Sequence, residues 1–384
     1  MTTARLLLAR LHARLVRAGV PEPSTNARYI LAAALGRKSV LDADVAVRSR
    51  EVLAGSVAAR ADALLVRRCR REPLQSVLGE WDFDVVRNLV VRCPVLIPRP
   101  ETEQLVEIVS SHIRALLTVG VASPVVLELG CGSGAISIAL LMRHPQLRIV
   151  AVDISREAVA LTLENAIQQG VADRLVVVEV NVAQQLLDGD NVLRALASFG
   201  GGPAPLLVSN PPYIPDRLLG ELQPEVRRWE DPRALCGGEH EGLDVPLAFL
   251  NAAVAAKWVT RDASALMEVH TTHPALLRHI LAPRHIGTTT DGAAVGATTR
   301  ASERSGNPDH PHHSRYKLDT LPAANGFAAA AAGPWLPSPA EERAMDAAAT
   351  ALAPVVTMTA LRWAWRGAWS DHSGQPRFVH LQTI

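Results

Sequence analysis

The sequence is poor in cysteine and has no long apolar run. Its four cysteines, Cys69, Cys93, Cys131 and Cys236, are far apart and form no CxxC pair, which argues against a disulfide framework and against a zinc site. We therefore infer a reducing compartment. No apolar run reaches the length of a membrane span, so we expect a soluble protein.

Net charge is also nearly absent. The chain has 39 Lys and Arg against 38 Asp and Glu, a formal charge of +1, which excludes an overall electrostatic attraction to nucleic acid or to an acidic membrane. What the chain has is apolar material: 48% of its 384 residues are hydrophobic. That is enough for a sizeable core and for two domains.

The first 75 or so residues predict a small helical domain, with helices over residues 2–18, 24–35 and 50–71. The first of these carries Arg5, Arg10, Arg14 and Arg17, no acidic residue, and leucines at helical spacing. That composition is typical of an amphipathic targeting sequence and equally of an ordinary first helix. We favour the ordinary helix, because the pattern continues without a break into the second helical stretch.

A dense basic cluster lies at the end of the third predicted helix. It consists of Arg67, Arg68, Arg70 and Arg71. As a solvated helix face favoured by the helix dipole the cluster needs no function. As a docking surface it would suit an RNA-bearing or acidic partner.

Residues 80–97 alternate between apolar and polar side chains, which predicts a β-hairpin with Arg87 and Asn88 between its strands. The paired prolines of Leu96–Glu103 then end the extended segment. A helix is expected to begin at Glu101.

A glycine-rich turn follows the apolar strand Val125–Leu129. The turn is Gly130–Gly134, and a helix is expected from Ala135. Glycines in such a turn let backbone N–H groups approach a ligand closely. The next predicted strand ends in Asp153, whose carboxylate can accept the hydroxyls of a ribose. This spacing predicts a cofactor that contains a nucleoside.

Two cofactors fit this spacing. Gly130, Gly132 and Ala135 satisfy the loose dinucleotide pattern of a dehydrogenase. S-adenosylmethionine is favoured because the charge of Glu128 would oppose a pyrophosphate, whereas a sulfonium cofactor carries no phosphate. We therefore expect a methyltransferase.

A rigid turn, Ser209–Tyr213, follows the apolar strand 204–208. Pro211 and Pro212 fix two φ angles and push Asn210 out of the helical region. The Asn210 side chain and the Pro211 carbonyl then form a fixed pair of acceptors, and Tyr213 adds an aromatic face beside them. Such a turn suits a flat amide or base that must be held while its nitrogen reacts. It is also compatible with a merely stiffened loop.

The last third of the chain predicts a strand over 265–269, a helix over 274–281, and a disordered insertion over about 284–338. His310, His312 and His313 lie in the insertion and lack the ordered neighbours that a metal site needs, so we expect no metal. A helix over 340–352, a strand over 355–365 and a turn leading into a final strand over 377–384 should complete the fold.

These motifs together resemble the HemK/PrmC family, the glutamine N5-methyltransferases of peptide chain release factors. The turn Asn-Pro-Pro-Tyr alone is shared with adenine-N6 DNA and guanine-N2 RNA methyltransferases, and the remaining segments make the resemblance diagnostic. The segments that carry it are Leu11–Leu35, Arg71–Leu74 with Leu78–Gly79, Leu96–Glu103, Glu128–Ala135, Asp153–Ser155 with Asn165–Ala166, Ser209–Pro215, and Gly237–Gly238 with Gly242–Asp244.

The resemblance implies an α/β chain with an N-terminal helical bundle domain and a Rossmann-like class I methyltransferase domain that uses S-adenosyl-L-methionine. Residues 1–78 would dock the substrate, 79–97 would form a hairpin linker, and 98–384 would form the methyltransferase domain. The implied reaction is methylation of the glutamine in the Gly-Gly-Gln loop of a release factor. We expect a monomer with no nucleic-acid or membrane partner, in the cytoplasm or the mitochondrial matrix, and not secreted.

The resemblance also assigns site residues. The catalytic set is Asn210, Pro211, Pro212 and Tyr213. The cofactor-binding set is Glu128, Gly130, Cys131, Gly132, Ser133, Gly134, Asp153, Ile154, Asn181, Val182 and Asn210. The pair Asn181-Val182 departs from the family, which often has an acid at the first position, so we expect weakened adenine binding. Two alternatives stay open: an N-methyltransferase acting on adenine or guanine of DNA or RNA, and a catalytically impaired module that only binds a release factor.

Overall fold

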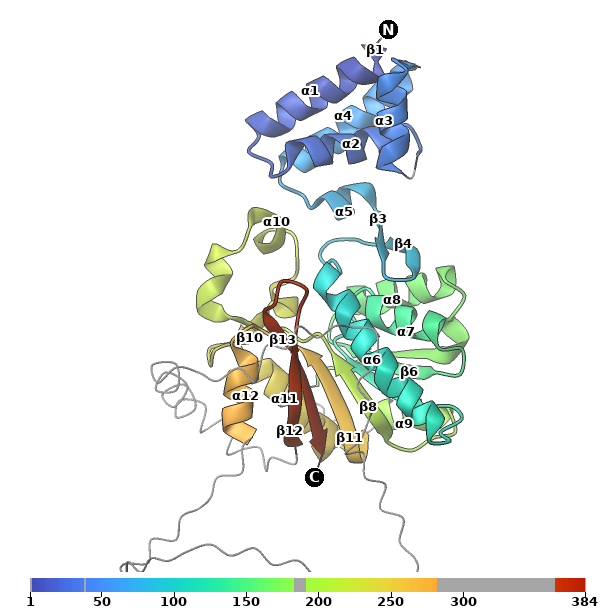
Figure 1. Ribbon diagram of the computed structural model, residues 1–384, viewed down its shortest axis with the longest axis vertical. Coiled ribbons are helices and arrows are strands. Elements are labelled where there is room, and N and C mark those ends of the chain that lie inside the picture. The colour runs from blue at the N-terminus through green and yellow to red at the C-terminus, as the bar shows by residue number, and fades with distance from the viewer. Residues whose placement is uncertain (1, 38, 183–190, 282–362, 384) are drawn as a thin grey trace, which may run out of the picture. The chain divides into compact units, whose positions relative to one another are not determined.

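A computed structural model describes residues 2–37, 39–182, 191–281 and 363–383. Its N-terminal part, in blue in Figure 1, is helical. The four long helices here are α1 (Ala4–Arg17), α2 (Pro23–Ala34), α3 (Val40–Arg48) and α4 (Gly55–Cys69). Leu7, Leu11 and Leu15 follow at helical spacing and are fully buried against α2 and α4. The first helix thus packs as part of a core, as an ordinary helix does.

The sequence prediction for this part was wrong in two places. The helix expected over 50–71 begins at Gly55, because Val52–Leu53 (β2) pairs antiparallel with Thr2–Thr3 (β1) and keeps the preceding residues extended. Helix α3 was missed. Its β-branched valines and its aspartates are poor helix formers, and it depends on a cap from the Ser39 hydroxyl and on burial of Ala43 and Ala46.

The predicted hairpin exists but is shorter and turns earlier. A short helix, α5 (Leu74–Leu78), leads into β3 (Glu80–Phe83) and β4 (Val86–Val90). The turn falls at Asp84 (φ +52°), a residue type that tolerates the left-handed region. Arg87 and Asn88, expected in the turn, lie inside β4. Residues 91–97 form no strand.

A mostly parallel sheet of seven strands forms the centre of the remaining chain. Its order is β12-β13-β11-β8-β5-β6-β7, and the pairing of β13 with both neighbours is antiparallel. The strands are β5 (Val125–Leu129), β6 (Arg148–Asp153), β7 (Leu175–Glu179), β8 (Ala204–Ser209), β11 (Val259–Glu268), β12 (Trp363–Ser370) and β13 (Pro376–Thr383). This order confirms the predicted Rossmann-like methyltransferase fold.

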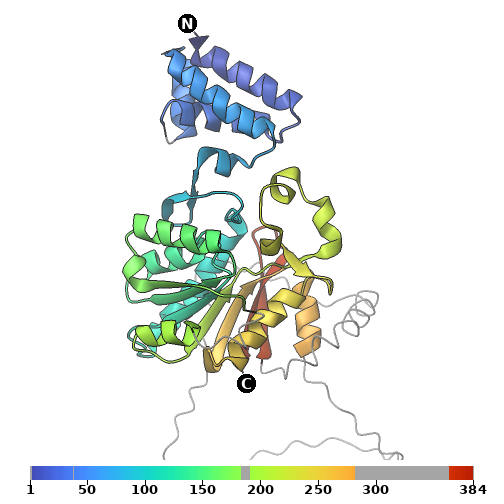
Figure 2. The same ribbon diagram turned by 180° about the vertical axis from the view of Figure 1, so that it is seen from behind.

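Helices cover both faces of the sheet, as Figures 1 and 2 show from opposite sides. One face packs against α6 (Pro100–Thr118), α7 (Ala135–Arg143) and α8 (Arg156–Gln168), and the other against α9 (Asn191–Ser198), α11 (Asp244–Ala255) and α12 (His273–Leu281). Both cores draw on the sheet: Val126 and Ile149 face one, Leu127 and Val150 the other. The central strands are therefore mostly apolar, as strands buried on both faces are, and Glu128 is a buried acidic residue within β5.

Short elements connect β8 to α11 at the edge where the parallel strands end. They are β9 (Ile214–Pro215), the 3-10 helix Asp216–Glu221, α10 (Pro224–Arg227), the 3-10 helix Pro232–Ala234 and β10 (Cys236–Gly238); a further 3-10 turn, Ala172–Arg174, precedes β7. Strands β9 and β10 pair in parallel.

The closing hairpin expected near the C-terminus is present as β12, a turn, and β13, but its first strand ends at Ser370 rather than at residue 365. The predicted insertion at 284–338, the histidines within it, the helix at 340–352 and most of the strand at 355–365 lie outside the described residues. Within the described ranges, no helix has the length and apolar character needed to cross a membrane.

Candidate active site

Sheet register brings the glycine turn and the Asn-Pro-Pro-Tyr turn together. Strands β5 and β8 are neighbours, with Leu129 opposite Ser209, so Gly130 and Asn210 follow at the same edge. A Cβ built on Gly130 would lie 3.9 Å from the backbone oxygen of Asn210. Asp153 ends the other neighbour of β5 at this edge. Three of the predicted motifs therefore converge, because the carboxyl ends of parallel strands lie along one edge of a sheet.

The glycine turn is held from behind by α8. The Thr162 hydroxyl donates to the Gly132 carbonyl (3.0 Å), and the Asn165 amide donates to the Ser133 carbonyl (2.9 Å). Gly134 (φ +80°) caps α7, and a Cβ there would lie 2.9 Å from Cγ2 of Thr162. Only glycine fits this position without displacing α8. Thr162 was not predicted as a contributor, although it precedes the quoted Asn165 by three positions, one helical turn.

Two further residues of the turn face the protein interior. Cys131 and Ser133 are buried, and burial raises the pKa of the Cys131 thiol well above its usual value. Cys131 therefore stays a thiol, not a thiolate. The turn offers a ligand its backbone rather than these two side chains.

The Asp153 carboxylate is positioned by backbone donors. It accepts N–H bonds from Gly132 (2.9 Å) and Ser155 (2.9 Å), one on each oxygen. Burial raises the pKa of this carboxyl, and those backbone N–H groups oppose the rise. Each oxygen keeps a second lone pair for a ligand hydroxyl. Ile154 beside it is 44% exposed, an apolar surface of the kind that a flat base covers.

Glu128 is fully buried and incompletely paired. The Ser137 hydroxyl donates to its Oε2, while its Oε1 has no hydrogen-bond partner. Burial raises the pKa of Glu128 to about 8, against the opposing hydrogen bond from Ser137. A buried acceptor without a hydrogen-bond donor is costly. The ammonium group of an amino-acid cofactor would donate to this oxygen, so the residues present here fit S-adenosylmethionine.

The remaining predicted cofactor residues follow β7. The N–H of Val180 donates to the Asp153 carbonyl (2.8 Å), which keeps this strand end beside β6. Val182 is buried and Asn181 is half-buried. Asn181 thus directly follows Val180, whose backbone hydrogen bond ties this segment to Asp153, the predicted ribose-binding acid.

A chain of side-chain hydrogen bonds holds the Asn-Pro-Pro-Tyr turn. The Asn210 amide Nδ2 donates to Oγ1 of Thr102 (3.1 Å), and that hydroxyl donates to Oε2 of Glu268 (2.7 Å). The Tyr213 hydroxyl donates to Oε1 of the same carboxyl (3.0 Å). Asn210, Pro212 and Tyr213 are half-buried and Pro211 is buried. Asn210 and Tyr213 are therefore both connected to Glu268.

Sequence reasoning missed the roles of Thr102 and Glu268. Each had a signal: Thr102 lies within Leu96–Glu103, a segment already noted, and Glu268 is an acid at the end of an apolar strand. Glu268 is 1% exposed. Burial raises its pKa, while the bonds from Thr102 and Tyr213 and the charge of Arg377 oppose the rise.

Glycines make room for the backbone of Tyr213. A Cβ on Gly237 would lie 2.7 Å from Cα of Tyr213 and would overlap the Gly242 carbonyl. A Cβ on Gly242 would overlap the Tyr213 carbonyl. Beside them, Ile214 pairs with Cys236 in the β9–β10 ladder. The glycines quoted for the family resemblance thus allow β10 and the chain after it to pack directly on the Asn-Pro-Pro-Tyr turn.

The arginine cluster at the end of α4 is largely engaged within the chain. Arg68, 3% exposed, and Arg71 both donate to the Glu225 carboxylate, at 3.0 Å and 2.6 Å. Arg67 bonds Glu72 (2.9 Å). A solvated face and an open docking surface are therefore both wrong for Arg68 and Arg71, whereas the Arg67 side chain stays 44% exposed. Glu225 lies in α10, on the segment that follows the Asn-Pro-Pro-Tyr turn.

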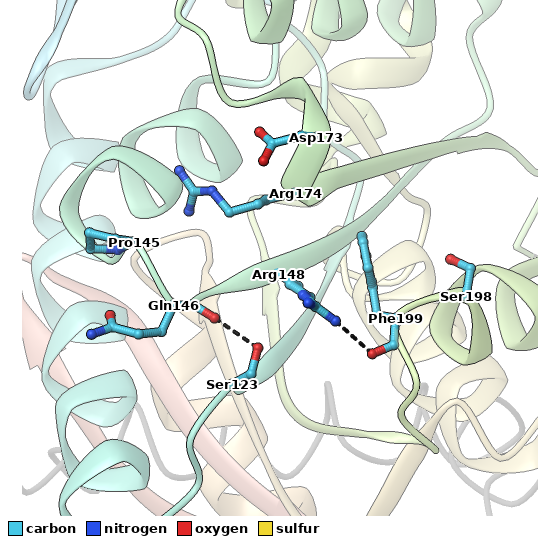
Figure 3. A pocket seen from close by; sticks show the side chains of 8 residues that line it. All are labelled: Ser123, Pro145, Gln146, Arg148, Asp173, Arg174, Ser198 and Phe199. Atoms are coloured by element: carbon cyan, nitrogen blue, oxygen red, sulfur yellow. Dashed lines mark hydrogen bonds between the residues drawn. The ribbon is translucent and has the colours of Figure 1, made fainter.

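A pocket of about 460 Å³ lies away from this edge, at the amino ends of β6 and β7. Figure 3 shows its two arginines pointing apart. Arg148 donates to the Phe199 carbonyl (2.8 Å), and Arg174 donates to the carbonyls of Leu141 (3.0 Å) and His144 (3.1 Å). Both guanidinium groups thus donate to backbone carbonyls of the protein itself. This pocket takes no part in the candidate site.

Comparisons with known proteins agree with the geometry. The description "PrmC N-terminal domain" matches residues 7–79, and "Methyltransferase small domain" matches residues 106–216. The chain is 38% identical over 268 residues to the MTRF1L release factor glutamine methyltransferase of Homo sapiens, covering 69% of this chain and 75% of that protein. It is similarly related to the release factor glutamine methyltransferases of Deinococcus radiodurans (37%; 66% and 81% covered) and Chlorobaculum tepidum (34%; 68% and 83% covered).

Proposed function

The chain belongs to the release factor glutamine methyltransferase family, and from this premise we propose that it methylates the N5 nitrogen of a release factor glutamine with S-adenosylmethionine as the methyl donor. The observation that carries the proposal is the meeting of Gly130 and Asn210 at one sheet edge. A cofactor on the glycine turn and an amide on the Asn-Pro-Pro-Tyr turn would be neighbours there, as methyl transfer requires.

The cofactor side of the site uses residues from three strand ends. The backbone of Gly130–Gly134 would hold the methionine part, Glu128 its ammonium group, and Asp153 the ribose hydroxyls. Ile154, Asn181 and Val182 would contact the adenine. The cofactor supplies an electrophilic methyl group, and the chain's own residues supply its position.

The substrate side orients a poor nucleophile. The two hydrogens of the glutamine amide would be accepted by Oδ1 of Asn210 and the carbonyl of Pro211, with Pro212 fixing the turn and Tyr213 packed against the amide plane. These acceptors stabilise the positive charge that develops on the nitrogen. The new N–C bond would form as the sulfur–methyl bond of the donor breaks, with its electron pair left on sulfur, and one amide hydrogen would leave as a proton to solvent. Positioning rather than a strong base therefore accounts for catalysis.

The rest of the chain would present the substrate. We assign residues 1–78 to docking of the release factor and 79–97 to a linker before the methyltransferase domain at 98–384. The protein would act as a monomer, without a nucleic-acid or membrane partner, wherever its release factor works, in the cytoplasm or the mitochondrial matrix. Localisation of the tagged full chain distinguishes the two compartments.

Mass spectrometry of the Gly-Gly-Gln peptide tests the proposal. Incubation of a release factor with the full chain and cofactor should add one methyl group to the glutamine. Asn210→Ala should abolish the transfer, by at least about 100-fold, while calorimetry shows unchanged binding of S-adenosylhomocysteine. A cofactor-bound wild-type protein that adds no methyl group to any release factor, or that labels RNA or DNA instead, would contradict the proposal.

A further inference from the structure

The buried carboxyl of Glu268 lies at the end of β11, behind the catalytic turn rather than at its surface. Its two oxygens receive different donors: Tyr213 bonds Oε1 at 3.0 Å and Thr102 bonds Oε2 at 2.7 Å. Thr102 is 3% exposed and lies in the first turn of α6. Its Oγ1 also accepts the Asn210 amide at 3.1 Å. Glu268 therefore reaches Asn210 through one intervening hydroxyl.

The direction of these hydrogen bonds follows from the charge of Glu268. An ionised carboxylate only accepts, so the Thr102 hydroxyl must donate to it. That hydroxyl has one hydrogen, and its oxygen is left to accept. The side of the Asn210 amide that faces Thr102 must then be the NH2 group. The other side, Oδ1, is the one turned away from Thr102.

A neutral Glu268 would not fix the direction of these hydrogen bonds. A protonated Oε2 could donate to Thr102, whose hydroxyl would then point at Asn210 and require the oxygen side of the amide. Burial favours the neutral form of Glu268, and so does Glu101, whereas the hydrogen bonds from Thr102 and Tyr213 and the charge of Arg377 favour the ionised form. The two hydroxyl donors, one on each oxygen, match an ionised carboxylate. Burial and Glu268 raise the pKa of Tyr213 against the opposing charges of Arg377 and Arg99, so its hydroxyl remains a donor.

Arg377 is itself fixed in place. Its Nε donates to the Asp371 carboxylate at 3.1 Å, in the turn between β12 and β13. The β12–β13 hairpin thus places the Arg377 guanidinium where it stabilises the charge of Glu268.

We propose that Glu268, acting through Thr102, is a positioning residue that fixes which side of the Asn210 amide meets the substrate, and so selects a glutamine amide over a glutamate carboxylate. This inference rests on the proposed function. With Oδ1 of Asn210 and the Pro211 carbonyl both presented, the site offers two acceptors. They suit the two hydrogens of an amide and repel the oxygens of a carboxylate.

Three full-length variants isolate the effect. Thr102→Val keeps the shape and removes the hydroxyl, and Thr102→Ser is the matched control that keeps it. Glu268→Gln keeps the volume and allows either direction of the hydrogen bonds. For each, binding is measured for a release factor that carries Gly-Gly-Gln and for the same factor with glutamate in place of that glutamine.

The preference for glutamine over glutamate should fall about tenfold or more in Thr102→Val and Glu268→Gln, with a matching loss of kcat. It should stay within about threefold of wild type in Thr102→Ser. If the residues had a merely structural role, binding of both release factors would weaken together and the ratio of the two affinities would not change. That outcome, or a lost preference in Thr102→Ser, overturns the inference even when wild type methylates its substrate.

A second readout does not depend on the substrate. In protein labelled at asparagine with nitrogen-15, the side-chain NH2 signals of Asn210 are identified by their disappearance in Asn210→Asp. These NH2 signals should exchange slowly with solvent in wild type and Thr102→Ser. In Thr102→Val and Glu268→Gln they should exchange fast, because the protection by the hydrogen bond to Thr102 is gone. Unprotected signals in wild type overturn the inference. An inactive wild type with protected signals overturns the proposed function alone.

Discussion

Replacing Gly237 by alanine should slow methyl transfer without touching substrate or cofactor. Ordinary van der Waals contact begins at 3.4 Å, and the new Cβ would lie 2.7 Å from Cα of Tyr213, so the two must separate by 0.7 Å or more (3.4 − 2.7). The new Cβ would also overlap the Gly242 carbonyl, and both neighbours are backbone and cannot rotate away. Because a displacement of about 1 Å at a reacting group costs about 100-fold, we expect kcat to fall about 30-fold, or about 2 kcal/mol of transition-state stabilisation.

Gly220→Ala is the matched control, since a Cβ there meets no atom within 4 Å and its φ is ordinary. The assay is single-turnover methyl transfer to a release factor, with S-adenosylhomocysteine binding measured alongside to show that the cofactor side is intact. A Gly237→Ala protein that turns over within threefold of wild type refutes the reasoning. Equal losses in Gly220→Ala would refute it as well.

Three other changes test the rest of the site. Gly134→Ala, with φ +80° and a Cβ 2.9 Å from Thr162, should weaken cofactor binding at least about tenfold by calorimetry. Cofactor binding at pH 7 should release up to about one proton, because Glu128, with a pKa of about 8, ionises beside a cation; heats in buffers of different ionisation enthalpy measure this, and Glu128→Gln should abolish it. Glu225→Gln should lower the free energy of unfolding in urea by about 3 kcal/mol, whereas Glu221→Gln, exposed on the same segment, should not. Burial would raise the pKa of Glu225, but its two arginines hold it below the usual value, so its stabilisation is present above about pH 4.5, the value for an unperturbed glutamate, and declines as the pH falls further.

Most of the sheet could be predicted from the sequence because its central strands are short, apolar and bounded by turns. Val125–Leu129 and Arg148–Asp153 have the bounds of β5 and β6, since their endings are marked by glycine and by an acid. The start of β11 was harder to place. Residues 259–264 include Arg261 and Asp262, which carry no apolar signal. In this part of β11, Val259 and Ser264 pair with β8, and the register shifts between them.

The candidate site was predictable where one short segment carries it. Each of the two motifs, Gly130–Gly134 and Ser209–Tyr213, can be recognised from five consecutive residues. The bonds from Asn210 to Thr102 and from Tyr213 to Glu268 join positions 108 and 55 apart in the chain. No local pattern encodes such a pairing. It depends on α6 and β11 packing together beside β8.

The Glu225 ion pairs also decide where the protein can be divided. The sequence suggests a cut near residue 79, between the N-terminal helices and the methyltransferase sheet. Such a cut would remove Arg68 and Arg71, both cations that bond Glu225. It would leave a buried carboxylate uncompensated on the segment after the Asn-Pro-Pro-Tyr turn. The part of the chain that folds independently is therefore larger than the part that carries the site residues. A chain that exchanged its N-terminal helices for others would have to change α10 with them, because the two share these ion pairs.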